Sequence, residues 1–172
     1  SGVGSLLHIA AAYVLKEFGI ADPVKDAIHI PLKGGGAAAT AVLNDTATFI
    51  CTNSSALASF VANKQLKPLL VTTAEPIVGF DAPTSADLGK PALTQLVGWT
   101  GIAGPDDLPD DIAAKWGAWM KTATDDADFR QKMESRGSVI RLMQPAESQA
   151  FIEGQYAVFR KLVDDLGMRI EN

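Results

Sequence analysis

A run of three glycines behind a lysine constrains the fold of this chain more than any other stretch. Residues 27–36 read Ala-Ile-His-Ile-Pro-Leu-Lys-Gly-Gly-Gly, and an alanine-rich segment over residues 37–43 follows. The apolar residues before the proline predict a short strand, and the alanines predict a helix. Glycines between two such elements let the backbone turn sharply and approach a ligand closely.

This glycine-rich stretch has two interpretations. In one, glycine serves the geometry of a strand-to-helix turn and nothing else. In the other, the free N–H groups at the helix start hold an anion, and Lys33 adds a full positive charge beside them. The rest of the chain has to decide between them.

Composition excludes several classes of function. A length of 172 residues suits one domain or two small lobes with a sizeable core. The net charge of −5, without any basic run, argues against a nucleic-acid partner. The longest apolar stretches are too short to cross a bilayer, so we expect no membrane insertion. No carboxylate or cysteine stands at metal-ligand spacing from either histidine, so we expect neither a metal nor a cofactor.

The first half of the chain alternates helical and strand-like segments. Helical spacing or caps predict helices over residues 6–18, 37–43 and 54–62, and apolar runs predict strands over residues 27–30, 46–51 and 66–72. This alternation predicts the α/β class, a mixed sheet with helices on both faces. Residues 74–95, with three prolines and little periodicity, indicate a long ordered loop.

The last third is mostly helical by the same criteria. Pro109, Asp125 or Asp126, and Pro145 are each expected at a helix start. Apolar runs predict further strands over residues 96–103 and 138–142.

Small polar residues and glycines gather at three predicted helix starts. In an open α/β sheet such junctions meet at the carboxyl ends of the strands, where ligands bind. Helix starts with hydroxyls, an amide and a lysine suit a small carboxylate, although three ordinary helix starts capped for stability would show the same pattern. The candidate ligand-binding residues are Ser1, Gly4, Ser5, Lys33, Gly34, Gly35, Gly36, Thr52 and Asn53.

No residue is predicted to be catalytic. Cys51 is the chain's single cysteine and ends an apolar run, which favours packing over nucleophilic chemistry. His8 and His29 are isolated in sequence and are interpreted as hydrogen-bonded structural histidines.

The order of several short motifs resembles the tripartite tricarboxylate transporter receptor family, whose members are the Bug or TctC-type periplasmic receptors. No single motif is decisive, but together they span essentially the whole chain. They are Ser1-Gly2-Val3-Gly4-Ser5 with His8, Ile28-His29-Ile30-Pro31-Leu32-Lys33-Gly34-Gly35-Gly36, Ser55-Ala56-Leu57, Leu69-Leu70-Val71-Thr72, Trp99-Thr100-Gly101-Ile102-Ala103-Gly104-Pro105 and the tail from Phe159 to Arg169.

This resemblance implies a type II periplasmic-binding-protein fold without catalysis. Such receptors capture small carboxylates, of the di- or tricarboxylate class, between two lobes in the periplasm and deliver them to a membrane permease. Residues 1–98 would form the second lobe, and residues 99–172 a crossover strand and a C-terminal segment returning to the first lobe. The family carries a long N-terminal half before the Ser-Gly-x-Gly-Ser motif, so that first lobe is expected to be incomplete here. Its uncovered apolar faces would favour a homodimer.

Two departures from the family pattern bear on the ligand. The strand and loop over residues 48–54 lack the acidic residue and proline often found there, and Leu32 replaces a common tyrosine. Two other classes stay open: the ligand-sensing effector domain of a transcription regulator, and a small hydrolase with Cys51 or a serine as nucleophile.

Overall fold

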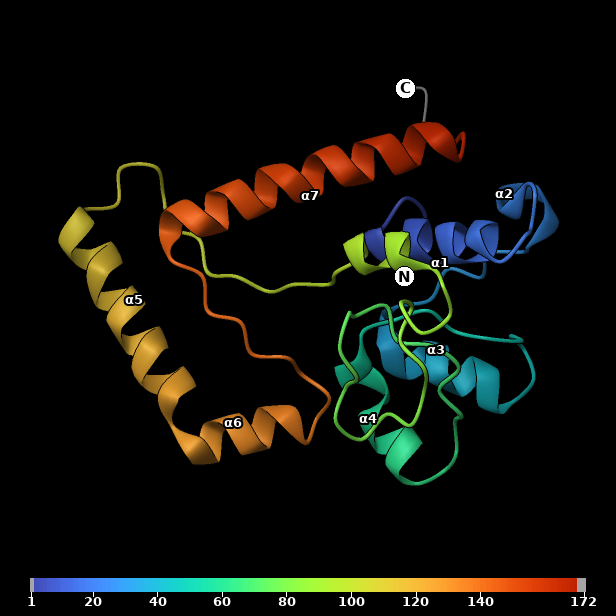
Figure 1. Cartoon of the computed structure of the whole chain (residues 1–172), viewed down its shortest axis with the longest axis horizontal. Helices are drawn as coiled ribbons and strands as arrows, with labels where there is room; N and C mark the ends of the chain where they lie inside the picture. Colours follow the sequence, from blue (N-terminus) through green and yellow to red (C-terminus); the bar gives the residue numbers. More distant parts are fainter. Residues whose placement is uncertain (1, 170–172) are drawn as a thin grey trace.

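The computed structural model describes residues 2–169 and consists of helices joined by long irregular segments (Figure 1). In chain order the helical elements are α1 (Leu6–Glu17), α2 (Pro23–Asp26), α3 (Gly34–Leu43), α4 (Ser54–Ala62), the 3₁₀ turn η1 (Pro91–Gln95), α5 (Asp110–Asp125), α6 (Ala127–Glu134) and α7 (Pro145–Asp165).

The core lies where α1, η1 and α7 meet. Leu93 of η1 is fully buried at 0% exposure, between Ile9 on α1 and Leu162 on α7 within one apolar cluster. In Figure 1, α7 runs along α1, with the 3₁₀ turn beside them. The first and last helices of the described chain therefore share one core.

Helices α3 and α4 form a second packed pair (Figure 1). The loop that follows them is held by local polar contacts. Thr84 donates its N–H and its hydroxyl to the Asp87 carboxylate, and the buried Ser85 hydroxyl donates to the Thr72 carbonyl at 3.3 Å. The predicted long ordered loop over residues 74–95 is confirmed, except that its end forms η1.

The predicted α/β fold, a type II periplasmic-binding-protein-like lobe with a mixed sheet and helices on both faces, is wrong for this structure. Within residues 2–169 the one β contact is an isolated parallel bridge between Val71 and Thr84. The five segments expected as strands run without a neighbouring strand, over residues 27–30, 46–51, 66–72, 96–103 and 138–142.

The physical reason lies in pairing. An extended segment satisfies its N–H and C=O groups only when another strand lies about 5 Å away. The apolar runs met the composition of strands, but none pairs with a neighbour beyond the single bridge at Val71. Several of their side chains are accordingly exposed, as the values of 92% for Ile28 and 67% for Leu69 indicate, whereas Val71 and Leu96 are buried.

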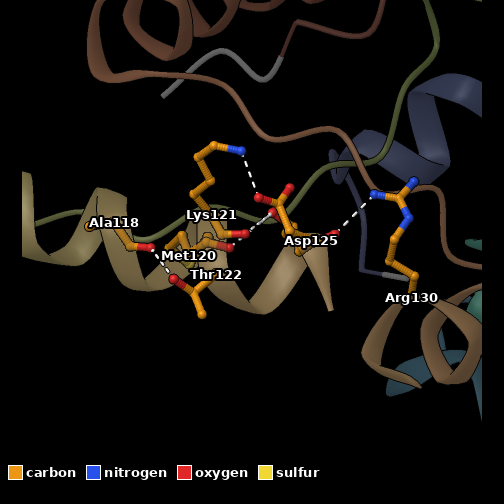
Figure 2. A network of polar contacts seen from close by, with 7 residues as sticks. Ala118, Met120, Lys121, Thr122, Asp125 and Arg130 are labelled. Carbon is orange, nitrogen blue, oxygen red and sulfur yellow. Dashed lines mark hydrogen bonds and ion pairs between the residues drawn. The ribbon is translucent and has the colours of Figure 1, made fainter. Parts of the chain in front are cut away.

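Helices α5 and α6 form an arm that stands away from both packed pairs (Figure 1). Neither helix has a buried residue. Figure 2 shows the polar contacts at their corner: Lys121 pairs with Asp125 at 2.6 Å, and Arg130 donates to the Thr124 carbonyl at 3.0 Å. The Asp126 carboxylate caps α6 by accepting from the Phe129 N–H, as predicted.

The chain returns from this arm through a contact with α4. The Ser54 hydroxyl donates to the Gly137 carbonyl at 2.5 Å, and Gly137 has a φ of +72°. A Cβ at Gly137 would lie 2.8 Å from the Phe80 ring, so only glycine fits there without a shift. The division into lobes over residues 1–98 and 99–172 stays a prediction.

Candidate binding site

The glycines behind Lys33 belong to a helix instead of forming a loop in front of it. Helix α3 begins at Gly34, whereas the alanine pattern predicted a start at residue 37. Gly34 has a φ of +83°, a left-handed conformation that L side chains rarely adopt. Three glycines therefore form the first turn of α3. Because glycine has no side chain, these residues do not cover their own N–H groups.

The start of α3 lies directly against the start of α4. A Cβ added to Gly35 would overlap the Ala56 Cβ and lie 3.6 Å from the Thr52 hydroxyl oxygen. Glycine at position 35 is thus required by the close approach of the two helices. The structure brings Gly35 next to Thr52, the residue that precedes the Asn53 N-cap of α4.

Neither of these two helix starts carries a stabilising acceptor from its own sequence. The N-cap residues, Lys33 for α3 and Asn53 for α4, make no side-chain cap bond, and no acidic residue lies in either first turn. Within residues 2–169, every other α-helix start has a side-chain cap, an acidic first turn or both. The positive ends of the α3 and α4 helix dipoles therefore lie close together. No acidic residue in either first turn offsets their charge.

The exposed Lys33 side chain adds a cationic group at the same place. Among the described residues no carboxylate pairs with it. Asn53 contacts the backbone of Gly98, where a Cβ would overlap the Asn53 amide oxygen. This ties the start of α4 to the segment that leads toward Trp99.

The third predicted junction, at α1, is occupied by internal contacts. The Ser5 hydroxyl accepts from the His8 N–H at 3.3 Å, and the Gly4 N–H donates to Nδ1 of His8 at 3.2 Å. Ser1 lies outside the described residues. The His8 ring stacks on His29, so the start of α1 is linked to the segment before Lys33.

Two hollows in the described surface lie along α7. One of about 480 Å³ contains the Arg169–Asp164 ion pair, and one of about 340 Å³ lies between α7 and Tyr13. Residues of α7 form most of the lining of both, and neither includes a predicted site residue.

Cys51 lacks the environment of a nucleophile. It packs half-buried against the core, and burial raises the pKa of its thiol to about 11. A thiol in that state is almost entirely protonated at neutral pH and unreactive. Within residues 2–169 no three His, Cys, Asp or Glu side chains gather as a metal site, and no helix has the length and hydropathy to span a membrane.

Comparison with known proteins places the chain in a family. The family model described as "Tripartite tricarboxylate transporter family receptor" matches residues 1–168. The chain belongs to this receptor family. Receptors of this kind are periplasmic binding proteins that serve a membrane transporter, and the resemblance read from the sequence motifs is confirmed.

One curated relative in this receptor family also matches. The "UPF0065 protein in clcB-clcD intergenic region" of Pseudomonas knackmussii is 22% identical over 139 residues, which is 80% of this chain and 79% of the relative. No solved structure matches the chain.

Two features of this surface went unnoticed in the sequence. The contact between Gly98 and Asn53 has no sequence signal, because it joins segments far apart in the chain. The stacking of His8 on His29 could have been suspected, since each histidine stands just before or within a predicted junction.

Proposed function

We propose that this chain binds a small carboxylate, of the di- or tricarboxylate class, and presents it to the membrane permease of a tripartite transporter in the periplasm. The carboxylate accepts hydrogen bonds from first-turn N–H groups of α3 at Gly34–Gly36. Thr52, Asn53 and Lys33 lie around it. No covalent step is involved.

A single observation supports this proposal most. The starts of α3 and α4 meet at Gly35, and both are without a side-chain cap or an acidic residue. Two partial positive charges beside a lysine favour an anion, and backbone N–H groups give it directional hydrogen bonds. The absence of an offsetting acidic side chain at this junction is what an anion site needs.

Calorimetric titration with citrate and with succinate tests this proposal. Gly36→Asp is the informative variant, because a Cβ at position 36 meets nothing within 4 Å and the change adds only negative charge. We expect Gly36→Asp to abolish binding and the neutral control Gly36→Asn to retain most of it. Equal affinities in the two variants would refute an anion site at this helix start.

A second variant reports on the lysine. Lys33→Gln removes the charge from an exposed side chain and leaves the helix start intact. We expect weaker binding with a smaller dependence on salt, because one cation fewer attracts the ligand. An unchanged affinity would assign binding to the backbone alone.

The two rival classes receive no such support. The hydrolase depends on a reactive Cys51 or serine, and the thiol is held protonated. The transcription-regulator alternative has no specific observation in its favour. The homodimer stays a prediction that light scattering tests directly.

A further inference from the structure

His8 and His29 form a face-to-face pair beside the candidate site. Their ring centroids are 3.7 Å apart and their planes differ by 11°. His8 lies in the first turn of α1, and His29 lies in the segment that leads into Lys33 and α3. The pair therefore joins two stretches of backbone that both end at predicted site residues.

This stack links residues 27–33 to helix α1. No backbone hydrogen bond outside the helices involves these residues within the described chain. His29 is half-buried, whereas Ile28 before it is 92% exposed and Ile30 after it is also exposed. Ala27 and Leu32 are half-buried as well, so the imidazole is one of three half-buried side chains in this segment.

The hydrogen bonding at His8 fixes its protonation state. Nδ1 accepts from the Gly4 N–H at 3.2 Å, so the ring is neutral and carries its proton on Nε2. A proton on Nδ1 would remove that acceptor. It would also put a positive charge at the positive end of α1 and against the face of a second imidazole.

We propose that the stack of a neutral His8 on His29 is a clamp that holds the Gly2–Ser5 turn to the approach of α3, and that protonation of His8 releases the clamp and weakens carboxylate binding. His8 and His29 act as positioning residues in this scheme, because neither has to touch the ligand. The binding half of the inference rests on the proposed function. The clamp itself is a property of the chain without ligand.

The surroundings of His8 favour its neutral form. Burial lowers the pKa of His8 below its ordinary value of 6.5, and the charge of His29 lowers it further. No carboxylate forms an ion pair with either ring within the described residues. A folded-state pKa below the unfolded value means that the unfolded chain binds more protons just below pH 6.5. The contribution of the clamp to stability is therefore present above that pH and is lost as the pH falls.

Nitrogen-detected NMR titration of the imidazoles, together with amide hydrogen exchange, tests the clamp without any ligand. We expect the Nε2–H tautomer at His8, a midpoint below 6.5, and loss of Gly4 amide protection at that same midpoint. In His8→Asn the side-chain oxygen replaces Nδ1 as an acceptor that does not titrate, so Gly4 should stay protected across the range. A midpoint at or above 6.5 with no response at Gly4 would overturn the clamp.

His29→Phe and His29→Ala separate stacking from charge. Phenylalanine keeps a ring over His8 and removes the neighbouring charge, so the pKa of His8 should rise while the backbone ¹⁵N order parameters of residues 28–30 stay high. Alanine removes the stack, so these order parameters should fall even at pH 8. Equal order parameters in both variants would show that the stack holds nothing.

Citrate affinity measured at pH 7.5 and 5.5 tests the link to binding. The ionisation of citrate affects wild type and His8→Asn alike, so the difference between them isolates the histidine. We expect wild type to lose on the order of fivefold more affinity than His8→Asn. Equal losses would contradict coupling to the site. If neither protein binds citrate, the proposed function fails, and the imidazole titration still decides the clamp.

Discussion

The α1–η1–α7 core and the α5–α6 arm are built from similar amphipathic sequence but end in different environments. Leu93 and Leu162 are buried among apolar neighbours, whereas Trp116 and Trp119 on α5 stay exposed. The two tryptophan rings contact each other edge-to-face, with their centroids 5.5 Å apart. An apolar stripe at helical spacing thus predicts a helix in both regions, but only the presence of an opposing surface turns the stripe into a core.

The largest expected effect of any single change is at the centre of the core. Leu93→Ala removes a side chain of 0% exposure, and its cavity should lower the free energy of unfolding by about 2–5 kcal/mol. Leu69→Ala is the matched control at 67% exposure, with an expected change within about 0.5 kcal/mol. Urea unfolding measures both. Similar losses in the two variants would mean that Leu69 is covered by something outside this structure.

The next largest effect is expected where α3 meets α4. Gly35→Ala places a methyl group onto the Ala56 Cβ, so it should cost about 1–3 kcal/mol as the two helices separate. Gly36→Ala faces open space in the same helix turn and should be neutral or stabilising by up to about 1 kcal/mol. Thermal unfolding of the two alanine variants compares them directly. A stable Gly35→Ala protein would show that the helices do not approach so closely.

Sequence patterns located helices well because helix signals are local. Ser5, Asp126 and Pro145 mark helix starts as predicted, and Gly19 and Gly167 lie just past helix ends with positive φ. The start of α3 was misplaced, because glycine has low intrinsic helix propensity and only its packing against Ala56 explains its place in the helix.

Sheet formation could not be predicted in the same way. Residues 66–72 have the composition of a strand, yet they form one isolated bridge to Thr84. Pairing depends on a second segment that the local pattern does not identify. For the candidate site, the sequence supplied the residue types at the α3 and α4 junctions. The contact that joins those junctions at Gly35 came only from the structure.

A smaller and more local effect is expected at the corner of the arm. Asp126→Ala removes the carboxylate that accepts from the Phe129 N–H at 2.7 Å, a loss of about 0.5–2 kcal/mol for the start of α6. Because the arm has no buried residue, the loss should appear as faster amide exchange in α6 with little change in global unfolding. Asp128→Ala is the control, since that residue is not the cap. If Asp126→Ala lowered the free energy of global unfolding by the whole of this amount, the arm would fold cooperatively with the core.

The smallest effect is expected on the exposed face of α5, and it tests the comparison most directly. Trp119 is 60% exposed and its ring contacts Trp116 edge-to-face, so Trp119→Ala should lower the free energy of unfolding by about 0.5–1 kcal/mol. Trp119→Phe keeps an aromatic edge and should cost less. A loss as large as that of Leu93→Ala, together with a melting temperature of the wild type that rises with concentration, would mean that a second copy covers α5. The arm would then be half of a core completed between chains, and its contrast with the α1–η1–α7 region would disappear.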